Sequence, residues 1–317
     1  MPALMTHRLF GEESIDLLPE GLIESSTDRM AFMLGNQGPD PFFFNYVHPN
    51  GHEARRLASI MHSTQPTRAF KALHDGVAHT HPNYASCARA FALGMLSHYV
   101  LDRCAHPFVY AQQFELEALD PSLKDVHSQV HAIIESDLDV LMLQTKCDGA
   151  TIAEYPPLST IGTTPEINLV AGALFSHIAH AVFDLNIPID QFEGAISDMQ
   201  LVYRLIEPAG SNLSNALARI ETLKREYSQL SALAHKVTTE APQHTGNLNH
   251  LLWQNPFTAE KSHESFAEVF DRALLDYQKT AQLFIAGDMH EVTRGLNYSG
   301  IALNADETTP ANPAHIF

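Results

Sequence analysis

The sequence predicts an all-α protein. Apolar residues recur three and four positions apart over most of the 317 residues, which is the spacing of one face of a helix. Alternating runs typical of half-buried strands are scarce, and no internal repeat or low-complexity tract interrupts the helical pattern. We therefore expect a multi-helix bundle, with additional helices in the C-terminal half.

Helical patterns cover most of the N-terminal half. They are expected at 9–22, 28–34, 53–76, 83–104 and 121–146. The turn Gly35-Asn36-Gln37-Gly38-Pro39-Asp40-Pro41 is rich in helix breakers and should follow the second helix, and His79-Thr80-His81-Pro82 should follow the third. Pro107 should end or kink the fourth helix, because proline has no amide hydrogen to donate.

The C-terminal half repeats this character. Helices are expected at 166–184, 188–207, 211–236 and 262–287, with breaks at 155–165 and 240–249. The Pro-rich break at 155–165 is the only plausible domain boundary. We therefore expect a first helical domain over 1–150 and a helical C-terminal extension over 151–317 that packs on it.

The composition allows a large core and disfavours two classes of partner. Hydrophobic residues make up 45% of the chain and charged residues 18%, which is enough to bury one large core or two smaller ones. The formal net charge is −18. Such an acidic chain is poorly suited to sequence-independent contact with nucleic-acid phosphates or to docking on anionic membranes. We expect no nucleic-acid partner and no stable membrane insertion.

The residues show neither a secretory signal nor a membrane-spanning run. The first residues, Met1-Pro2-Ala3-Leu4-Met5-Thr6-His7-Arg8, lack a charged start followed by an apolar stretch, and no run of about eighteen apolar residues occurs. Three cysteines are too few for a disulfide framework. We expect a cytoplasmic protein, and the sequence leaves its oligomeric state open.

A first run of histidine and carboxylate carries a strong functional signal. His98, Asp102 and His106 lie four residues apart, so a helix would stack all three along one face. Imidazole and carboxylate groups suit zinc best, although iron, manganese and nickel remain possible. Cys104 lies inside this run, either as a further ligand or as a small core residue on the opposite helix face.

A second run repeats the pattern within forty residues. His127, His131 and Glu135 have the same spacing, and Asp139 falls one turn further along the same face. His127 is either a ligand or a solvent-facing residue. If the two helices pack face to face, two or three metal ions would lie within about 4 Å of one another, the arrangement that serves metal-assisted phosphoester hydrolysis.

Three isolated residues could complete these sites. Asp40 lies in a rigid Gly-Pro-Asp-Pro turn, His62 on an apolar helical stretch, and His7 just before an apolar helix. A single histidine on an apolar face is more often a buried structural residue than a ligand, so neither histidine alone would indicate a metal. The other histidines of the N-terminal half are expected at the surface or in loops: His48, His52, His74, His79 and His81.

The order of these motifs resembles the bacterial zinc-dependent phospholipase C family, whose fold is shared with fungal zinc-dependent single-strand nucleases. The resemblance covers about residues 1–145 and is weaker beyond, through Trp253-Gln254-Asn255-Pro256 and Ser265-Phe266-Ala267-Glu268. The motifs that carry it are Thr6-His7-Arg8-Leu9-Phe10-Gly11, Leu34-Gly35-Asn36-Gln37-Gly38-Pro39-Asp40-Pro41-Phe42, His62, His98-Tyr99-Val100-Leu101-Asp102 with His106-Pro107, and His131 with Glu135.

The resemblance implies two to three zinc ions and names their ligands. Asp102 would bridge two of the metals. Carried over position by position, a first zinc would be held by Asp40, His62, His98 and Asp102, a second by His106, His131 and Glu135, and a third by His7 with Asp102.

The chain departs from the family pattern at two places. The family's third zinc also uses the amine and carbonyl of the mature N-terminal residue, whereas this chain begins Met1-Pro2 and His7 follows very soon. The third site therefore has fewer protein ligands, uses another carboxylate, or is absent. His106 follows Asp102 by four residues where the secreted enzymes have six, which alters the second zinc site but keeps both residues on one helix face.

The expected chemistry is hydrolysis of a phosphate ester by a metal-activated water. The metals would bind the phosphate oxygens and lower the pKa of the water, and Asp40 would orient that water or act as general base. The substrate would be a phospholipid or a small soluble phosphoester. Phe42-Phe43-Phe44-Asn45-Tyr46 is either an apolar rim beside the site or core, and Trp253 and Phe257 are candidate lid residues.

Two other functions remain open at this point. A single-strand nuclease or nucleotidase on the same fold would need aromatic stacking platforms and a basic groove, for which 19 Lys and Arg residues provide little. A metal-binding helical protein without turnover would serve a structural role. Turnover of a chromogenic choline phosphodiester, compared with single-stranded DNA, separates these alternatives.

Overall fold

The computed structural model describes residues 4–211, 214 and 229–315 and confirms the all-α prediction. Within these residues the sheet structure is limited to a short antiparallel pair, β1 (Trp253–Gln254) and β2 (Lys261–Ser262), in which Trp253 lies opposite Ser262. The α-helices are α1 (Leu4–Ile15), α2 (Ser26–Gly35), α3 (Gly51–Ser63), α4 (Pro66–Ala78), α5 (Ala85–Leu119), α6 (His127–Lys146), α7 (Pro165–Phe183), α8 (Gln191–Ile206), α10 (Gln229–Leu233), α11 (Phe266–Ala286) and α12 (Met289–Thr293).

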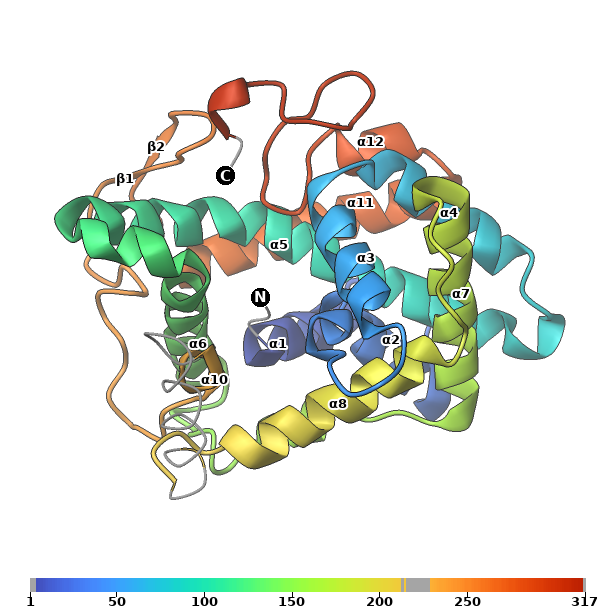
Figure 1. Ribbon diagram of the computed structural model, residues 1–317, viewed down its shortest axis with the longest axis horizontal. Coiled ribbons are helices and arrows are strands. Elements are labelled where there is room, and N and C mark those ends of the chain that lie inside the picture. Colours follow the sequence, from blue (N-terminus) through green and yellow to red (C-terminus); the bar gives the residue numbers. More distant parts are fainter. Residues whose placement is uncertain (1–3, 212–213, 215–228, 316–317) are drawn as a thin grey trace.

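Helix α5 is the long central helix against which most of the other helices pack. It is 35 residues long, and α2 and α11 pack along it (Figure 1). Helices α1 and α6 contact each other and α5, whereas α7 and α8 form the opposite wall. This arrangement surrounds the middle of α5, where the candidate ligands lie, with helices from both halves of the chain.

Local sequence explains where several helices begin. Ser25 and Asp28 form a capping box at the start of α2, and Ser265 and Glu268 form another at the start of α11. Each serine side chain accepts a hydrogen bond from a backbone amide that would otherwise lack a partner in the first turn. Thr164 caps α7 in the same way, ahead of a proline at the first helical position.

Two expected helix boundaries were wrong because of proline. The single helix expected at 53–76 is two helices, α3 and α4, because Pro66 cannot continue α3 and Gln65 before it adopts a left-handed conformation with φ 52°. Conversely, Pro107 does not end the fourth helix, since α5 runs through it to Leu119. Burial of Phe108 and Val109 keeps the chain helical despite the missing hydrogen bond.

The remaining helices differ from expectation mainly at their ends. The first begins at Leu4 and stops at Ile15 rather than covering 9–22, and the segment 121–126 is a 3-10 helix that precedes α6. The expected helix at 211–236 lies largely outside the described residues, which include only its last part, α10.

Helix α7 is long and apolar enough to span a membrane by length and composition. The sequence analysis did not identify it as such a segment. Half of its apolar window is nevertheless buried within the protein, and the helix packs against α4 and α8. A buried core helix of a helical bundle has the same length and composition.

Candidate metal centre

The structure brings all the predicted ligands to the middle of α5. Helices α1 and α6 pack against α5 and against each other, and the last turn of α3 and the 3-10 helix η1 (Asp40–Phe44) bring one further residue each to the same place. The residues are His7 on α1, Asp40 on η1, His62 on α3, His98, Asp102 and His106 on α5, and His131 and Glu135 on α6.

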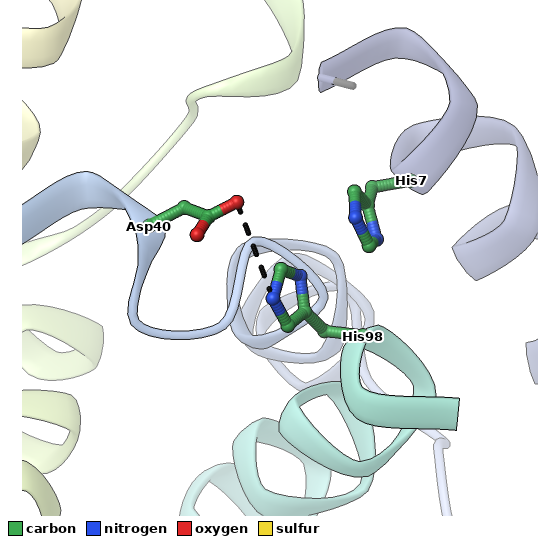
Figure 2. Close-up of side chains that lie close together, drawn as sticks. All are labelled: His7, Asp40 and His98. Carbon is green, nitrogen blue, oxygen red and sulfur yellow. Dashed lines mark ion pairs between the residues drawn. The ribbon is translucent and has the colours of Figure 1, made fainter. Parts of the chain in front are cut away.

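A first cluster gathers His7, Asp40, His62, His98 and Asp102. His62 Nε2 lies 3.0 Å from Asp40 Oδ1, and His98 Nε2 lies 3.3 Å from Asp102 Oδ2. His7 Nε2 is 3.1 Å from Asp102 Oδ1, and its ring stacks on that of His98 with centroids 4.2 Å apart. Figure 2 shows Asp40 facing the two rings, with Asp40 Oδ2 4.0 Å from His98 Nε2.

A second cluster gathers His106, His131 and Glu135. Glu135 Oε1 lies 3.2 Å from His131 Nε2 and 3.5 Å from His106 Nε2. The two clusters meet at Asp102, whose Oδ1 is 3.9 Å from His106 Nε2. Asp102 therefore reaches residues of both clusters, as expected of a carboxylate that bridges metals.

The electrostatics of the site favour the metal-binding protonation state in two of its histidines, whereas Asp102 and Glu135 outweigh burial at His106 and raise its pKa. Burial lowers the pKa of His98 and of His131, so both rings are neutral at neutral pH. Burial alone would raise the pKa of Asp102, but the His98 and His106 imidazoles outweigh it and hold that pKa well below its usual range. Neutral imidazole and ionised carboxylate are the ligand forms that bind zinc.

The other two carboxyl groups behave in the same way. Burial opposes ionisation of Asp40, yet the nearby His98 and His62 rings lower its pKa. The pKa of Glu135 is also lowered, because the positive charge of the chain's amino terminus, together with His131 and His106, outweighs the effect of burial. All three acids are therefore charged within a largely enclosed site, which favours a cation at their centre.

Unsatisfied polar atoms show that the residues fit a metal. His98 is fully buried, yet neither of its ring nitrogens has a hydrogen-bond partner among the described residues. Burying such a nitrogen without a partner is costly, and a metal ligand bond would remove the cost at Nε2. The residues form three groups, within each of which the ligand atoms lie within 4.8 Å of one another, and the first two groups share His98: His7 with Asp40 and His98, His62 with His98 and Asp102, and His106 with His131 and Glu135.

Glycines allow the Asp40 turn to approach α5. A Cβ on Gly38 would lie 2.3 Å from His98 Cδ2, and the residue has a φ of 55°. Gly35 and Gly94 let α2 and α5 come into backbone contact, because a Cβ on Gly94 would lie 2.1 Å from the Phe32 carbonyl oxygen. The breaker-rich turn in the sequence is thus the segment that places Asp40 over His98.

Hydrogen bonds at Nδ1 orient three of the histidines, whose Nε2 atoms face the site. Nδ1 of His62 donates to the Ala58 carbonyl at 2.7 Å, and Nδ1 of His106 donates to the Tyr298 carbonyl at 2.9 Å. Nδ1 of His131 pairs with Gln113 Oε1 at 2.9 Å. Such partners fix the tautomer and ring orientation of a ligand. Sequence reasoning missed Gln113, although it lies seven residues after His106 on the same helix face.

Asp139 supports the site without joining either cluster. Its carboxylate accepts hydrogen bonds from the backbone amides of Met5 at 2.9 Å and Thr6 at 2.7 Å, and so holds the first turn of the helix that carries His7. His235 donates to the same carboxylate through Nε2 at 2.9 Å. The sequence placed Asp139 on the ligand face but gave no sign of this partner 96 residues away.

Several open alternatives are now decided by position. The side chain of His127 is 58% exposed and pairs with Glu117, so it lies outside the second cluster. Cys104 is half-buried near Asp276 and belongs to neither cluster. Phe42 is core, whereas Phe43 packs against the ring of His62 at 5.3 Å.

The aromatic residues suggested as a lid lie along α5. Trp253 packs on Phe108 with ring centroids 5.2 Å apart, and Phe257 packs on Tyr110 at 5.5 Å. Tyr110 in turn lies 4.9 Å from the ring of His131. Phe257 therefore reaches the second cluster through one intervening aromatic ring, while Trp253 does not contact it.

Comparison with known protein families shows which family has this pattern of residues. The profile described as zinc dependent phospholipase C matches residues 6–178, which is 173 of the 317 residues and includes every candidate ligand. The chain belongs to the zinc-dependent phospholipase C family. No curated protein and no solved structure matches it. Membership confirms the resemblance read from the motifs, and the buried His, Asp and Glu groups are those that could hold the family's zinc.

Proposed function

We propose that this member of the zinc-dependent phospholipase C family is a phosphoesterase that hydrolyses a phosphodiester with water. The observation that carries the proposal is the position of Asp102, between a cluster around His98 and a cluster around Glu135. Two adjoining ligand sets that share a carboxylate suit more than one metal, and multiple metals suit in-line displacement at phosphorus. Two to three zinc ions per chain are part of the proposal.

The metal ligands of the proposal follow the geometry. His106, His131 and Glu135 would hold one zinc, and the residues around His98 would hold the rest. Bound zinc would supply Lewis-acid polarisation of the phosphate and a lowered pKa for the attacking water. The protein itself holds His98 and His131 neutral and Asp102 charged, and it orients three rings through their Nδ1 atoms.

Asp40 is the proposed catalytic residue. Its carboxylate is 2% exposed and lies at the end of a turn that the glycines bring close to His98. Because its pKa is lowered, Asp40 is a weak base, which favours the role of orienting the attacking water by accepting its hydrogen bond.

Exposed apolar side chains follow the 3-10 helix that begins with Asp40. Tyr46 is 71% exposed and Val47 72% exposed, and they lie two and three residues after its last residue, Phe44. They could meet the apolar part of a lipid or a small ester, and Arg55 lies over the Tyr46 ring at 4.5 Å. The acidic chain favours a soluble phosphoester or a headgroup over an intact anionic bilayer.

The test combines metal content with turnover. We expect two to three zinc ions per chain by mass spectrometry and hydrolysis of p-nitrophenyl phosphocholine, with little release from single-stranded DNA. Asp102→Asn should lose metal and activity together. Glu115→Gln, an exposed carboxylate change on the same helix, is the matched control and should keep both.

Three results would contradict the proposal. An Asp102→Asn protein with full metal content and full turnover would refute the assignment of the bridging ligand. A zinc-loaded protein that cleaves DNA but no choline phosphodiester would favour a nuclease, and one that cleaves neither would favour a metal-binding structural role.

A further inference from the structure

A second cavity lies behind α5, away from the metal centre. Its volume is about 1000 Å³, and none of the candidate ligands lines it. Its α5 wall is formed by Arg103, Cys104 and Pro107, which point to a different side of the helix from His98 and Asp102. The β1–β2 hairpin, α11 and the segment 294–300 supply the other walls (Figure 1).

Positive charge is concentrated in this cavity. The chain has only 19 Lys and Arg residues and a net charge of −18, yet five cations line this one space, against the carboxylates of Glu260, Glu264 and Asp276. Five minus three leaves a surplus of two positive charges. The cations are Arg103, Lys261, Arg272, Lys279 and Arg294.

The ion pairs within the cavity do not neutralise this surplus. One oxygen of Asp276 serves two guanidinium groups, Arg103 Nη2 at 2.8 Å and Arg294 Nη2 at 2.7 Å. Arg272 pairs with Glu264 at 3.0 Å. Lys261 and Lys279 have no ion pair within the part of the chain that the structure describes.

The innermost cation also has spare bonding capacity. The side chain of Arg103 is 1% exposed, and its Nε has no hydrogen-bond partner among the described residues. Its Nη1 donates to the Val292 carbonyl and its Nη2 to Asp276 and Thr280, so Arg103 contributes a fixed positive charge to the inner wall. Trp253, Leu275 and Leu296 add apolar surface to the same walls.

We propose that this cavity binds a small organic molecule carrying a phosphate monoester. Its volume lies at the upper end of the range for small-molecule sites. A phosphate monoester carries close to two negative charges at neutral pH and three acceptor oxygens on one group, which matches the surplus charge and the guanidinium and ammonium donors. Apart from the α5 residues, the walls lie beyond residue 178, outside the family match. Binding here does not require hydrolysis at the metal centre.

Trp253 provides a direct readout. It is the chain's only tryptophan and lines the cavity, so intrinsic tryptophan fluorescence reports on the surroundings of this one residue. The zinc-loaded protein is titrated with glycerol 2-phosphate, inorganic phosphate, succinate, and potassium chloride at matched ionic strength. We expect a saturable emission change with glycerol 2-phosphate. Weaker binding of inorganic phosphate would support an organic ester, and equal affinity would overturn the organic ester in favour of free phosphate.

Charge-neutralising variants separate this cavity from the metal centre. The double variant Lys261→Gln with Lys279→Gln should weaken the response at least tenfold. The control pair Lys71→Gln with Lys124→Gln removes the same charge from exposed positions outside the cavity and should leave the response unchanged. The proposal is overturned if glycerol 2-phosphate acts only as potassium chloride does, if succinate binds at least as tightly, or if the cavity variant responds like wild type.

Discussion

Gln113 provides the sharpest test of how the second cluster is built. Its Oε1 lies 2.9 Å from His131 Nδ1, and its Nε2 donates to Glu117 at 2.8 Å. Gln113 is 3% exposed, so water cannot readily take its place. We predict that Gln113→Leu leaves His131 without the partner that fixes its tautomer and ring orientation, while Glu117 keeps its contact with His127.

The size of the effect follows from that lost contact. Removing a hydrogen-bond partner of a ligating histidine typically weakens metal binding about 10- to 100-fold, equivalent to about 1.4–2.7 kcal/mol. A buried N–H left unsatisfied costs about 1–3 kcal/mol, which is the same range. We therefore expect one zinc per chain to bind 10- to 100-fold more weakly in Gln113→Leu.

Competition with a chromogenic zinc chelator measures this affinity. The matched control is Gln112→Leu, the same change one residue earlier, because Gln112 bonds to the Thr245 carbonyl at 2.7 Å rather than to a ligand. The control should keep the wild-type affinity for every zinc. If Gln113→Leu binds zinc as tightly as wild type, or if both variants lose affinity equally, then Gln113 does not orient His131.

Three further predictions concern the rest of the site. Gly38→Ala should lower the free energy of unfolding by about 1–2 kcal/mol, because alanine is strained in the left-handed backbone conformation of this residue. It should also weaken zinc binding, because the new methyl group displaces the His98 ring. Thermal melts test the first effect and metal analysis tests the second. Hydrogen bonds to Asp139 and Glu207 outweigh burial and raise the pKa of His235 to about 9, so its stabilisation is fully present below pH 6.5 and is lost as the pH rises through 9. Wild type should therefore lose about 3 kcal/mol more between pH 6 and pH 10 than His235→Gln does, measured by denaturant unfolding. Removing zinc with a chelator should lower the unfolding free energy by about 4 kcal/mol at a free zinc concentration of 1,000 times Kd, and a melting temperature that chelation leaves unchanged would argue against a metal in the folded protein.

The all-α class and the two ligand runs could be recognised without any knowledge of the fold. Both rest on local geometry: residues four apart share a helix face wherever the helix packs, so His98, Asp102 and His106 were recognisable before any fold was known. Asp40 and His62 were recognised by their order along the chain relative to those runs, and this order suggested the zinc-dependent phospholipase C family to which the chain belongs.

How these parts meet depends on contacts between segments that are distant in the sequence. Whether Pro107 ends its helix depends on the burial of Phe108 and Val109, and the role of Asp139 depends on two amides more than 130 residues away. The cationic cavity behind α5 likewise draws on segments that are far apart in sequence. Such features depend on packing between distant segments, and local periodicity carries no information about which distant segments become neighbours.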